Sequence, residues 1–447
     1  MKTISREQAL QWIAQGESQK CEERMAEVNR RLHDLVLYVR EHSPYFRDAY
    51  KDLGEAFILQ DLPVTTKAGL LECYDHWVTD PKVTEESVRT YLSDLENVSE
   101  NYLGRYTALS TSGTTGNPMP MVRDEYHNTI HGCLMEQRLL KGIEASLLSS
   151  KVASIIATDG FVSSYSSALR IKRRLGDRSD RFLILSVLTP TTEIVEKLNV
   201  FQPEMLTGYP SVLEVLAREK LAGRLSITPD VIASSAEKMT RDTYETLRNA
   251  FDCPILDNYC STEGGEIAMS CSHGYLHLNE DWIILEPVDE EFRPVQLGEW
   301  SSGVLITDLT NFVQPIIRYH VGDCVRFSGQ PCACGSNLPV LEISGRMGDM
   351  LSLNDTSVAF PVLYFMLSDV KNLSSWQIVQ TGGNAITFRF IEKHGTSREP
   401  VGIAACEKLQ QSLRSYGCGE VVVTISHEPF IKNPKGGKTP YVLNRSQ

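Results

Sequence analysis

The sequence lacks the segments that carry a protein into or across a membrane. Its 447 residues contain no apolar run near the ~20 residues that a membrane-spanning helix needs. The opening MKTISREQALQWIAQ has no apolar core of the kind found in signal peptides. Positive charge is also scarce, since 44 Lys and Arg face 57 Asp and Glu and the net charge is −13. We therefore expect neither nucleic acid nor an anionic membrane as a general partner, because both require a basic face.

Disulfides are not expected either, although the chain has 11 cysteines. Their number is odd, and they are scattered from Cys21 to Cys418. Without a signal peptide, the sequence favours a reducing, cytoplasmic location, where disulfides are rare. Cysteines that lie close together in such a protein are better interpreted as metal ligands than as disulfide partners.

The length and the apolar pattern predict two domains of different size. Hydrophobic cores stop growing near ~250–300 residues, so this chain needs a large domain and at least one smaller one. Residues 5–42 carry an apolar stripe at three- and four-residue steps, which predicts a helix that ends at Pro44. From about residue 150, short β-rich runs alternate with helical stretches, a rhythm typical of α/β layers with a largely parallel sheet.

The texture changes again after GRMGDM, at about residues 346–350. β-rich runs, a Gly-Gly turn and one helix follow, which predicts a small α+β unit. We therefore predict an α/β fold with a large multi-layer N-terminal domain with mostly parallel sheets over 1–345. A small, mobile α+β C-terminal domain over 346–447 would be joined to it by a hinge.

The least ordinary stretch is LSTSGTTGNP at 109–118, where seven of ten residues are Ser, Thr or Gly. It is either a flexible linker or a loop that wraps a phosphate. A linker would join two domains, whereas this run lies inside the predicted large domain. Gly113 and Gly116 allow positive φ and close backbone approach, and N–H and hydroxyl groups can then surround phosphate oxygens. The spacing is not that of a Walker A loop.

Four further motifs carry polar residues suited to nucleotide chemistry. YCSTEGG places Thr262 and Glu263 after a predicted strand, where a carboxylate can hold Mg²⁺ or simply form a polar turn. RYHVGD places Asp323 after a glycine, where it can accept both ribose hydroxyls or, more commonly, occupy a turn. GRMGD carries Arg346 at the domain boundary. PKGGK carries Lys438, which is either solvated or delivers its charge to the other domain.

In this order, STSGTTGNP, YCSTEGG, RYHVGD, GRMGD and PKGGK resemble the core motifs of the adenylate-forming superfamily of acyl-CoA synthetases. The closest resemblance is to the phenylacetate–CoA ligase branch, which includes coenzyme F390 synthetase and indoleacetate–lysine synthetase-like proteins. It covers about residues 30–445. The resemblance implies an enzyme in which a carboxylate, which we expect to be aromatic, attacks the α-phosphorus of ATP. The acyl-adenylate then passes its acyl group to a nucleophile, usually coenzyme A, and releases AMP.

The resemblance also implies which residues bind the nucleotide. The glycine run would hold the β- and γ-phosphates through Thr111, Ser112, Gly113, Thr114, Thr115 and Gly116. Two strand ends would border the adenine through Ser235, Ala236, Glu237, Asp257, Asn258 and Tyr259.

The catalytic roles follow from the same resemblance. Glu263 would bind Mg²⁺, with Thr262 near the α-phosphate. Asp323 would hold the ribose hydroxyls, and Arg346 would contact the ribose or a phosphate. Lys438 would stabilise the charge that develops as the carboxylate attacks, since in-line displacement at phosphorus depends on positioned cations and donors.

Several positions depart from the family pattern. Met119 stands where the superfamily often has Lys, although the phenylacetate branch tends to lack that Lys too. Cys260 replaces a Gly, and Gly348 stands at the hinge position. After Lys438 the usual basic residues are replaced by Thr439, Pro440 and Tyr441.

The replacement after Lys438 leaves the acceptor open between coenzyme A, an amine, a carrier protein, and transfer of AMP itself as in coenzyme F390 synthetase. A non-catalytic nucleotide-binding protein is a further alternative, which the retained Glu263, Asp323, Arg346 and Lys438 argue against. A homodimer is also allowed.

A second set of residues is suited to a structural zinc ion. Cys271 and His277 are close in sequence, and Cys332 and Cys334 form Cys-Ala-Cys-Gly, so that four protein ligands could surround one tetrahedral ion. The alternative is four unrelated residues, with the free cysteines acting as small hydrophobes. His273 is the rival histidine. Some phenylacetate-ligase-like proteins carry a similar arrangement, and we favour zinc.

The sequence says least about which residues form the pocket for the acid. The resemblance places it among ATDGFVSS, LTGYPS and Ser234. Phe161 and Tyr209 would line an aryl group, or both are core aromatics. Asp159 would pair with a polar substituent of the acid, or cap a turn.

Overall fold

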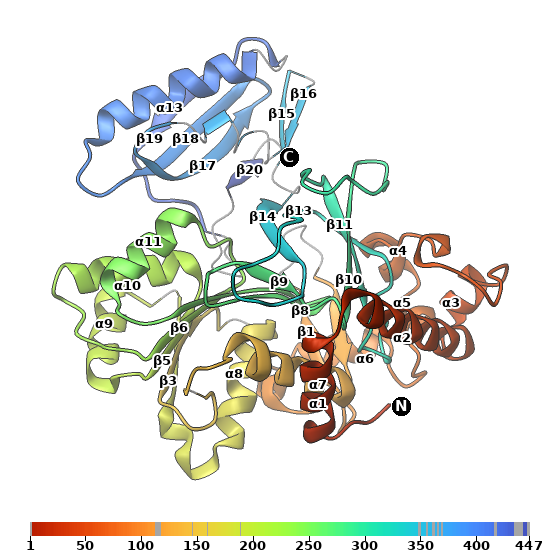
Figure 1. Ribbon diagram of the computed structural model, residues 1–447. Coiled ribbons are helices and arrows are strands. Elements are labelled where there is room, and N and C mark those ends of the chain that lie inside the picture. Colours follow the sequence, from red (N-terminus) through yellow and green to blue (C-terminus); the bar gives the residue numbers. More distant parts are fainter. Residues whose placement is uncertain are drawn as a thin grey trace.

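The computed structural model describes residues 2–111, 118–144, 146–158, 160–187, 189–346, 350–354, 356–359, 363, 366–367, 370–414, 418–432 and 441–444. The chain forms a large body that carries the N-terminus and a smaller one above it in Figure 1. Within the part of the chain that is described, no helix combines the length and apolar character that a bilayer crossing requires.

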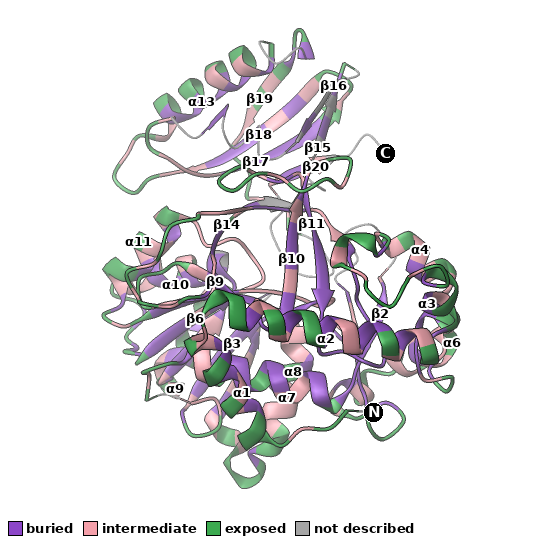
Figure 2. Ribbon diagram, turned by 45° about the vertical axis from the view of Figure 1, so that its right-hand side comes forward, coloured by how far each residue is buried: buried purple, intermediate pink, exposed green. Residues whose placement is uncertain are grey.

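The N-terminal region is helical, as the apolar stripe predicts, but it forms two helices. The predicted single helix is interrupted at Gln19, whose extended backbone ends α1 (Arg6–Ser18) before α2 (Cys21–His42) begins. The stripe of α2 is buried, and Figure 2 shows exposed residues on its outer face. Pro44 ends α2 and opens α3 (Pro44–Ala49), which Ser43 caps by accepting a hydrogen bond from the Phe46 amide. Three short helices follow: α4 (Lys67–Glu72), α5 (Tyr74–Trp77) and α6 (Glu85–Leu92).

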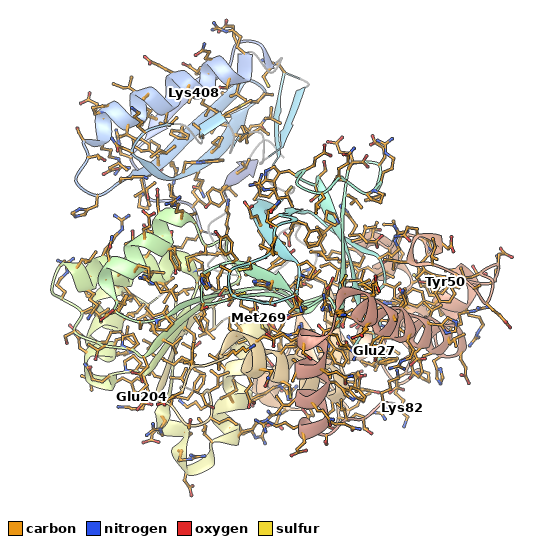
Figure 3. The ribbon with its side chains drawn as sticks, viewed as in Figure 1. Glu27, Tyr50, Lys82, Glu204, Met269 and Lys408 are labelled. Atoms are coloured by element: carbon orange, nitrogen blue, oxygen red, sulfur yellow. The ribbon has the colours of Figure 1, made fainter. Side chains whose placement is uncertain are left out.

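A nine-stranded sheet forms the centre of the large body, in the order β13-β14-β9-β8-β7-β6-β5-β3-β4. Five strands pair in parallel: β4 (Phe182–Ser186), β3 (Val152–Ile156), β5 (Met205–Gly208), β6 (Val231–Ser235) and β7 (Ile255–Ser261). The pairing becomes antiparallel from β8 (Gly265–Ser270) through β9 (Leu276–Leu278), β14 (Val340–Arg346) and β13 (Asp323–Phe327). The predicted α/β class is confirmed, with the parallel pairing confined to half of this sheet. Met269 of β8, at the centre of Figure 3, is buried in the main core.

Helices between the parallel strands cover both faces of the sheet. The chain moves one way from β3 to β4 and the other way from β4 through β5 and β6 to β7. Right-handed crossovers therefore place α8 (Ser163–Arg174) on one face, opposite α9 (Thr191–Phe201), α10 (Pro210–Leu221) and α11 (Arg241–Ala250) (Figure 1). The direction of winding reverses between β3 and β5. In sheets of this type, a ligand crevice forms at the carboxyl ends of the strands where the winding reverses.

Smaller elements complete the large body. A hairpin of β1 (Thr107–Ser110) and β2 (Pro120–Arg123) leads into α7 (Glu125–Leu134). A separate antiparallel sheet consists of β10 (Ile283–Val288), β11 (Gly303–Asp308) and β12 (Tyr319–Val321).

The small body has its own α+β architecture, as predicted. Its sheet has the order β19-β18-β17-β20, from β17 (Leu373–Gly382), β18 (Ala385–Glu392), β19 (Val422–Ser426) and β20 (Val442–Asn444). The helix α13 (Arg398–Leu413) packs on β18 and β19, and the hairpin of β15 (Met350–Leu353) and β16 (Thr356–Ala359) contacts β20. Its hydrophobic core runs from Leu351 to Val442, whereas the main core ends at Leu341. A domain boundary at residue 346 stays a prediction.

Candidate functional site

The glycine run joins the two strands of one hairpin. β1 and β2 pair from Thr107 opposite Arg123 to Ser110 opposite Pro120. The pairing extends to Thr111, whose amide donates to the Met119 carbonyl over 3.1 Å, while the Met119 amide donates to the Thr111 hydroxyl over 2.9 Å. The run therefore does not link two domains. The predicted phosphate ligands Ser112, Gly113, Thr114, Thr115 and Gly116 lie outside the described residues.

The predicted ribose and adenine residues converge at one edge of the sheet. The Tyr259 hydroxyl donates to Oδ2 of Asp323 over 2.7 Å. Asp323 opens β13 and lies opposite Arg346 of β14, whose side chain is outside the described residues. Asn258 points to the other face of β7, is buried, and donates to the Glu266 carboxylate. The Asn258 side chain is therefore not brought to this edge.

The turn after β6 reaches the same edge. Ser235 lies beside Asn258 in the parallel pair β6–β7. Ala236 has a φ of 70°, a left-handed backbone that is uncommon outside glycine and frequent at functional sites. The turn continues through Glu237 to Lys238, whose ammonium group donates to the Ser344 carbonyl over 3.4 Å, and burial lowers the pKa of Lys238 to about 8. The predicted adenine segment 235–237 therefore lies next to the strand that carries Arg346.

Thr262 and Glu263 form the turn between β7 and β8, and basic residues surround them that the motifs did not reveal. The Arg123 guanidinium donates to the carbonyl of Thr262 over 2.8 Å. Lys67 lies close enough to Glu263 for the carboxylate to raise its pKa, although burial outweighs this and holds the pKa of Lys67 below its usual range. Arg89 of α6 donates to the carbonyl of Pro118, at the end of the glycine run, over 3.3 Å. These cations come from α4, α6 and β2. They stand at no fixed sequence distance from the motifs, so the motifs could not reveal them.

Two of the predicted acid-binding residues, Phe161 and Tyr209, lie where the winding of the sheet reverses. The Tyr209 hydroxyl, after β5, accepts a hydrogen bond from the Ala157 amide, after β3, over 3.1 Å. Tyr209 packs in the main core, as the alternative interpretation has it, and burial raises its pKa. Phe161 is also buried, and its carbonyl accepts from the Ser110 amide over 2.9 Å. Asp159 lies outside the described residues.

Ser234, at the end of β6, is tied to a buried carboxylate. Its hydroxyl donates to Oδ1 of Asp257 on the neighbouring strand over 2.6 Å. The Asp257 amide donates to the Ser270 hydroxyl over 2.7 Å. Burial raises the pKa of Asp257 to about 6. One ionisable group, the Asp257 carboxyl, thus lies beside the predicted acid pocket.

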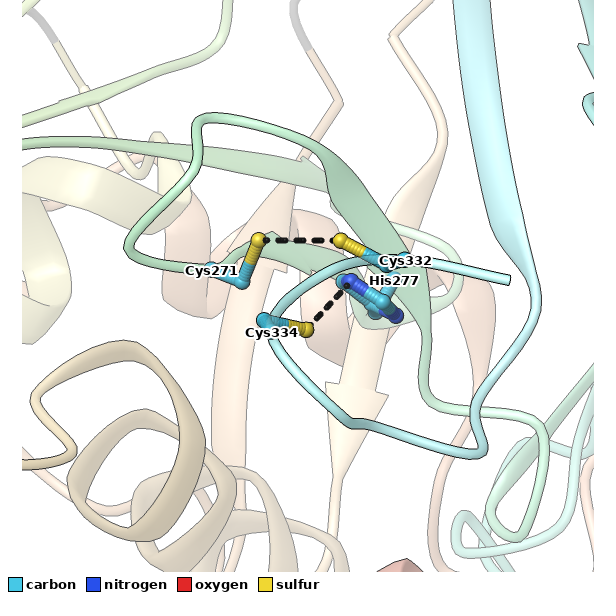
Figure 4. Close-up of side chains that lie close together, drawn as sticks. All are labelled: Cys271, His277, Cys332 and Cys334. Carbon is cyan, nitrogen blue, oxygen red and sulfur yellow. Dashed lines mark hydrogen bonds between the residues drawn. The ribbon is translucent and has the colours of Figure 1, made fainter. Parts of the chain in front are cut away.

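The four predicted zinc ligands come together, and their ligand atoms all lie within 4.8 Å of one another (Figure 4). The Sγ atoms of Cys271 and Cys332 are 3.8 Å apart, and Sγ of Cys334 is 3.4 Å from Nε2 of His277. A tetrahedral ion with Zn–S near ~2.3 Å and Zn–N near ~2.0 Å would separate these pairs by about 3.8 and 3.5 Å. The donor set and its spacing therefore fit zinc.

Neighbouring groups set the protonation of the ligand side chains His277 and Cys334. Nδ1 of His277 donates to the Leu338 carbonyl over 2.9 Å, which leaves Nε2 with the lone pair that a metal needs. Burial raises the pKa of the Cys334 thiol to about 11, a shift that a bound cation would reverse. The rival His273 is exposed, and its backbone amide donates to Sγ of Cys271 over 3.4 Å. His277, and not His273, completes this set of four.

Comparison with known proteins identifies the fold. No family model matches the sequence. The solved structure of 2-hydroxyisobutyryl-CoA ligase in its postadenylation state superposes with a TM-score of 0.70 at 18% identity, over 97% of this chain and 92% of that one. This chain has the fold of an adenylate-forming CoA ligase.

Sequence comparison extends the adenylate-forming resemblance. Phenylacetate-coenzyme A ligase of Thermus thermophilus is 25% identical over 350 residues, 73% of this chain and 71% of that protein. Protein CapK of Staphylococcus aureus is 29% identical over 168 residues, 37% of this chain and 36% of CapK, so the match spans about a third of that relative. The predicted resemblance to the adenylate-forming superfamily and its phenylacetate–CoA ligase branch is confirmed.

Proposed function

We propose that this chain activates a carboxylic acid with ATP and Mg²⁺ as an acyl-adenylate, and then transfers the acyl group to coenzyme A. The observation that carries the proposal is the convergence, at one edge of the sheet, of the Tyr259–Asp323 pair, the 235–237 turn and the Thr262–Glu263 turn. The adenylate-forming fold and the relation to a phenylacetate–CoA ligase support the same reaction.

The residues divide the binding of ATP between them. Asp323 would accept the ribose hydroxyls, with Tyr259 holding the carboxylate in place. The 235–237 turn would border the adenine through its backbone. The hairpin that contains residues 111–116 would surround the β- and γ-phosphates, and Arg346 would contact the ribose or a phosphate.

The displacement at phosphorus needs positive charge more than covalent catalysis. Glu263 offers a carboxylate of the kind that binds Mg²⁺, with Thr262 beside it, and the ion would neutralise phosphate charge when bound. Lys67 and Arg89 supply fixed cations from α4 and α6, which suits a chain with Met119 in place of the usual lysine. Lys438 of the small domain would complete the set as the acid carboxylate attacks.

The acid would bind in the crevice between β3 and β5, close to Phe161, Tyr209 and Ser234. Aromatic side chains at this position favour an aryl or arylacetic acid. Asp159 would contact a polar substituent of that acid.

The test is ATP–pyrophosphate exchange with a panel of aryl and arylacetic acids in the absence of an acceptor. We expect exchange that depends on Mg²⁺ and on one class of acid. Asp323→Asn should lower it strongly, whereas Glu290→Gln, at an exposed turn, should leave it unchanged. Measurable ATP binding without exchange for any acid would contradict the proposal.

A second acceptor has one specific observation in its favour. The family's basic residues after the catalytic lysine are replaced by Thr439, Pro440 and Tyr441. The Tyr441 ring packs on Trp376 with centroids 5.3 Å apart. This is an apolar contact, whereas a residue that binds a phosphate group of coenzyme A would be positively charged. An amine, a carrier protein or AMP transfer would then replace coenzyme A. Mass spectrometry of products with coenzyme A and with candidate amines separates these possibilities. The homodimer and the cytoplasmic location stay predictions.

We further infer that Cys271, His277, Cys332 and Cys334 bind a structural zinc ion. Four protein ligands leave no open coordination position, so the ion would stabilise the fold and take no part in the reaction. Metal analysis after purification without chelators should find about one zinc per chain. A protein that is folded and active without zinc would contradict this assignment.

A further inference from the structure

A buried polar cluster lies directly behind the Thr262–Glu263 turn, and no motif pointed to it. It consists of Arg123 at the end of β2, His127 and His131 of α7, and Asp308 and Thr310 at the end of β11. All five side chains are buried, and those of His127, Asp308 and Thr310 are fully so. Such groups are expensive to desolvate, so their arrangement requires an explanation.

Hydrogen bonds link four of these side chains, those of His127, His131, Asp308 and Thr310. The Thr310 hydroxyl donates to Oδ1 of Asp308 over 2.5 Å. It lies 2.8 Å from Nδ1 of His127 and 3.1 Å from Nε2 of His131, so both rings can donate to it. Burial lowers the pKa of His127 to about 3, which keeps that ring neutral. The Thr310 hydroxyl thus lies within hydrogen-bond distance of both histidines and of Asp308.

His131 uses its other nitrogen to hold the far side of the turn. Nδ1 of His131 accepts a hydrogen bond from the Glu266 amide over 2.9 Å. The ring also packs closely on Gly265, where a Cβ atom would lie 2.4 Å from Cε1 of His131 and where φ is +65°. Glycine at this position therefore allows the imidazole to reach the backbone of the turn.

Arg123 holds the near side of the same turn. Its guanidinium donates to the carbonyls of Ser261 and Thr262 over 3.2 and 2.8 Å. Glu263 consequently sits between two anchors, Arg123 before it and His131 after it. Because Arg123 ends β2, it also connects the hairpin of β1 and β2 to the turn.

We propose that Arg123 and His131 are positioning residues that fix the Glu263 carboxylate relative to the phosphate-binding hairpin. The inference rests on the proposed function, in which Glu263 binds Mg²⁺ with ATP. If the turn were free to move, fixing the Glu263 carboxylate on binding would cost entropy and weaken its affinity for Mg²⁺. Hydrogen bonds between the backbone of the turn and the side chains of Arg123 and His131 remove that freedom in advance.

His131 offers the cleaner test, because its neighbours allow a matched pair of variants. His131→Leu removes the acceptor for the Glu266 amide, whereas His131→Asn keeps an oxygen at the place of Nδ1. Asn128→Ala is the control, since Asn128 lies on the same helix and the one described hydrogen bond of its side chain goes to Thr107. The measurement is the Mg²⁺ concentration for half-maximal ATP–pyrophosphate exchange, with the KM of the acid as internal reference.

We expect His131→Leu to raise the half-saturating Mg²⁺ concentration about tenfold, the effect of one buried hydrogen bond, with the KM of the acid unchanged. His131→Asn should recover most of this loss, and Asn128→Ala should stay near the wild type. Variants that merely fold less well would lose kcat at an unchanged Mg²⁺ requirement. An unchanged requirement in folded His131→Leu would overturn the proposal.

Hydrogen–deuterium exchange of the peptide containing Glu266 supplies a readout that does not depend on activity. The Glu266 amide should exchange faster in His131→Leu than in the wild type, and protection should return in His131→Asn. If the wild type shows no ATP–pyrophosphate exchange with any acid, the proposed function fails. The protection of Glu266 then still decides the anchoring, and equal protection in His131→Leu and the wild type would overturn it.

Discussion

Asp257→Asn should stabilise the protein at neutral pH, because the wild-type carboxylate is ionised at a free-energy cost. Burial raises the pKa of Asp257 from 3.8 to about 6, against the opposing hydrogen bond from Ser234. One pKa unit corresponds to about 1.4 kcal/mol, so the shift of roughly two units amounts to about 3 kcal/mol. Asp257 keeps some contact with solvent, which makes this an upper limit.

The sign of the pH dependence follows from linkage. The folded state holds the proton of Asp257 more tightly than the unfolded state does, so its contribution is most favourable below the unfolded pKa of 3.8. That contribution is lost as pH rises through the window from 3.8 to about 6. Asparagine has the same shape, can accept the Ser234 hydrogen bond and does not titrate. The free energy of unfolding of the variant should therefore exceed that of the wild type by about 0.5 kcal/mol at pH 4 and by about 3 kcal/mol at pH 7.

Urea unfolding followed by tryptophan fluorescence at several pH values measures this difference. Asp124, whose pKa burial also raises to about 6, titrates in both proteins and cancels in the comparison. Ser234→Ala is the opposing variant, since it removes the donor that favours the carboxylate and should destabilise the protein at pH 7. A constant difference between wild type and Asp257→Asn across this range would refute the reasoning, because the gain would then not come from titration.

Three further changes test the other parts of the site. Cys334→Ser should reduce the zinc content from about one per chain to near zero, as measured by elemental analysis, while Cys253→Ser outside the set should retain it. Lys67→Met should raise the KM for ATP roughly fivefold at an unchanged KM for the acid, the effect of about 1 kcal/mol from a half-exposed charge, whereas the exposed Lys82→Met should not. Tyr259→Phe removes the hydrogen bond to Asp323 and should raise the KM for ATP about tenfold, and steady-state kinetics showing no change would remove the ribose assignment.

Residues near strand ends were predictable from the sequence. The order of the strands brings their ends together, and this does not depend on how individual side chains pack. Asp323 and Tyr259 are examples, since each motif follows or opens a strand and the two meet across the sheet. Cys271 and Cys334 were found for a related reason, as their spacing with Cys and His partners is typical of a metal site.

The residues that escaped prediction act through elements with no periodic relation to the motifs. Lys67 comes from a short helix in the N-terminal region, and Arg123 and His131 from β2 and α7. The partners of Arg123 and His131 are a backbone carbonyl and a backbone amide of the turn, which leave no mark in the sequence. The antiparallel half of the sheet was also not visible, because a buried strand has the same apolar pattern in either direction.

The predicted zinc and the predicted nucleotide site are joined by the hairpin of β13 and β14. Asp323 and Arg346 face one another at one end of this hairpin, and Cys332 and Cys334 lie in the loop at its other end. β14 pairs with β9 through two residue pairs, Val340 with His277 and Leu341 with Leu276, which is a short contact to hold a strand that leads into the predicted hinge. An ion bound by His277, Cys271 and the two loop cysteines would pin that contact directly. Because a slip of one residue would turn every side chain of β14 to the opposite face, the ion would also fix which face of the hairpin is turned toward β9. A structural zinc would therefore stabilise a strand contact that the large core of this domain does not itself secure.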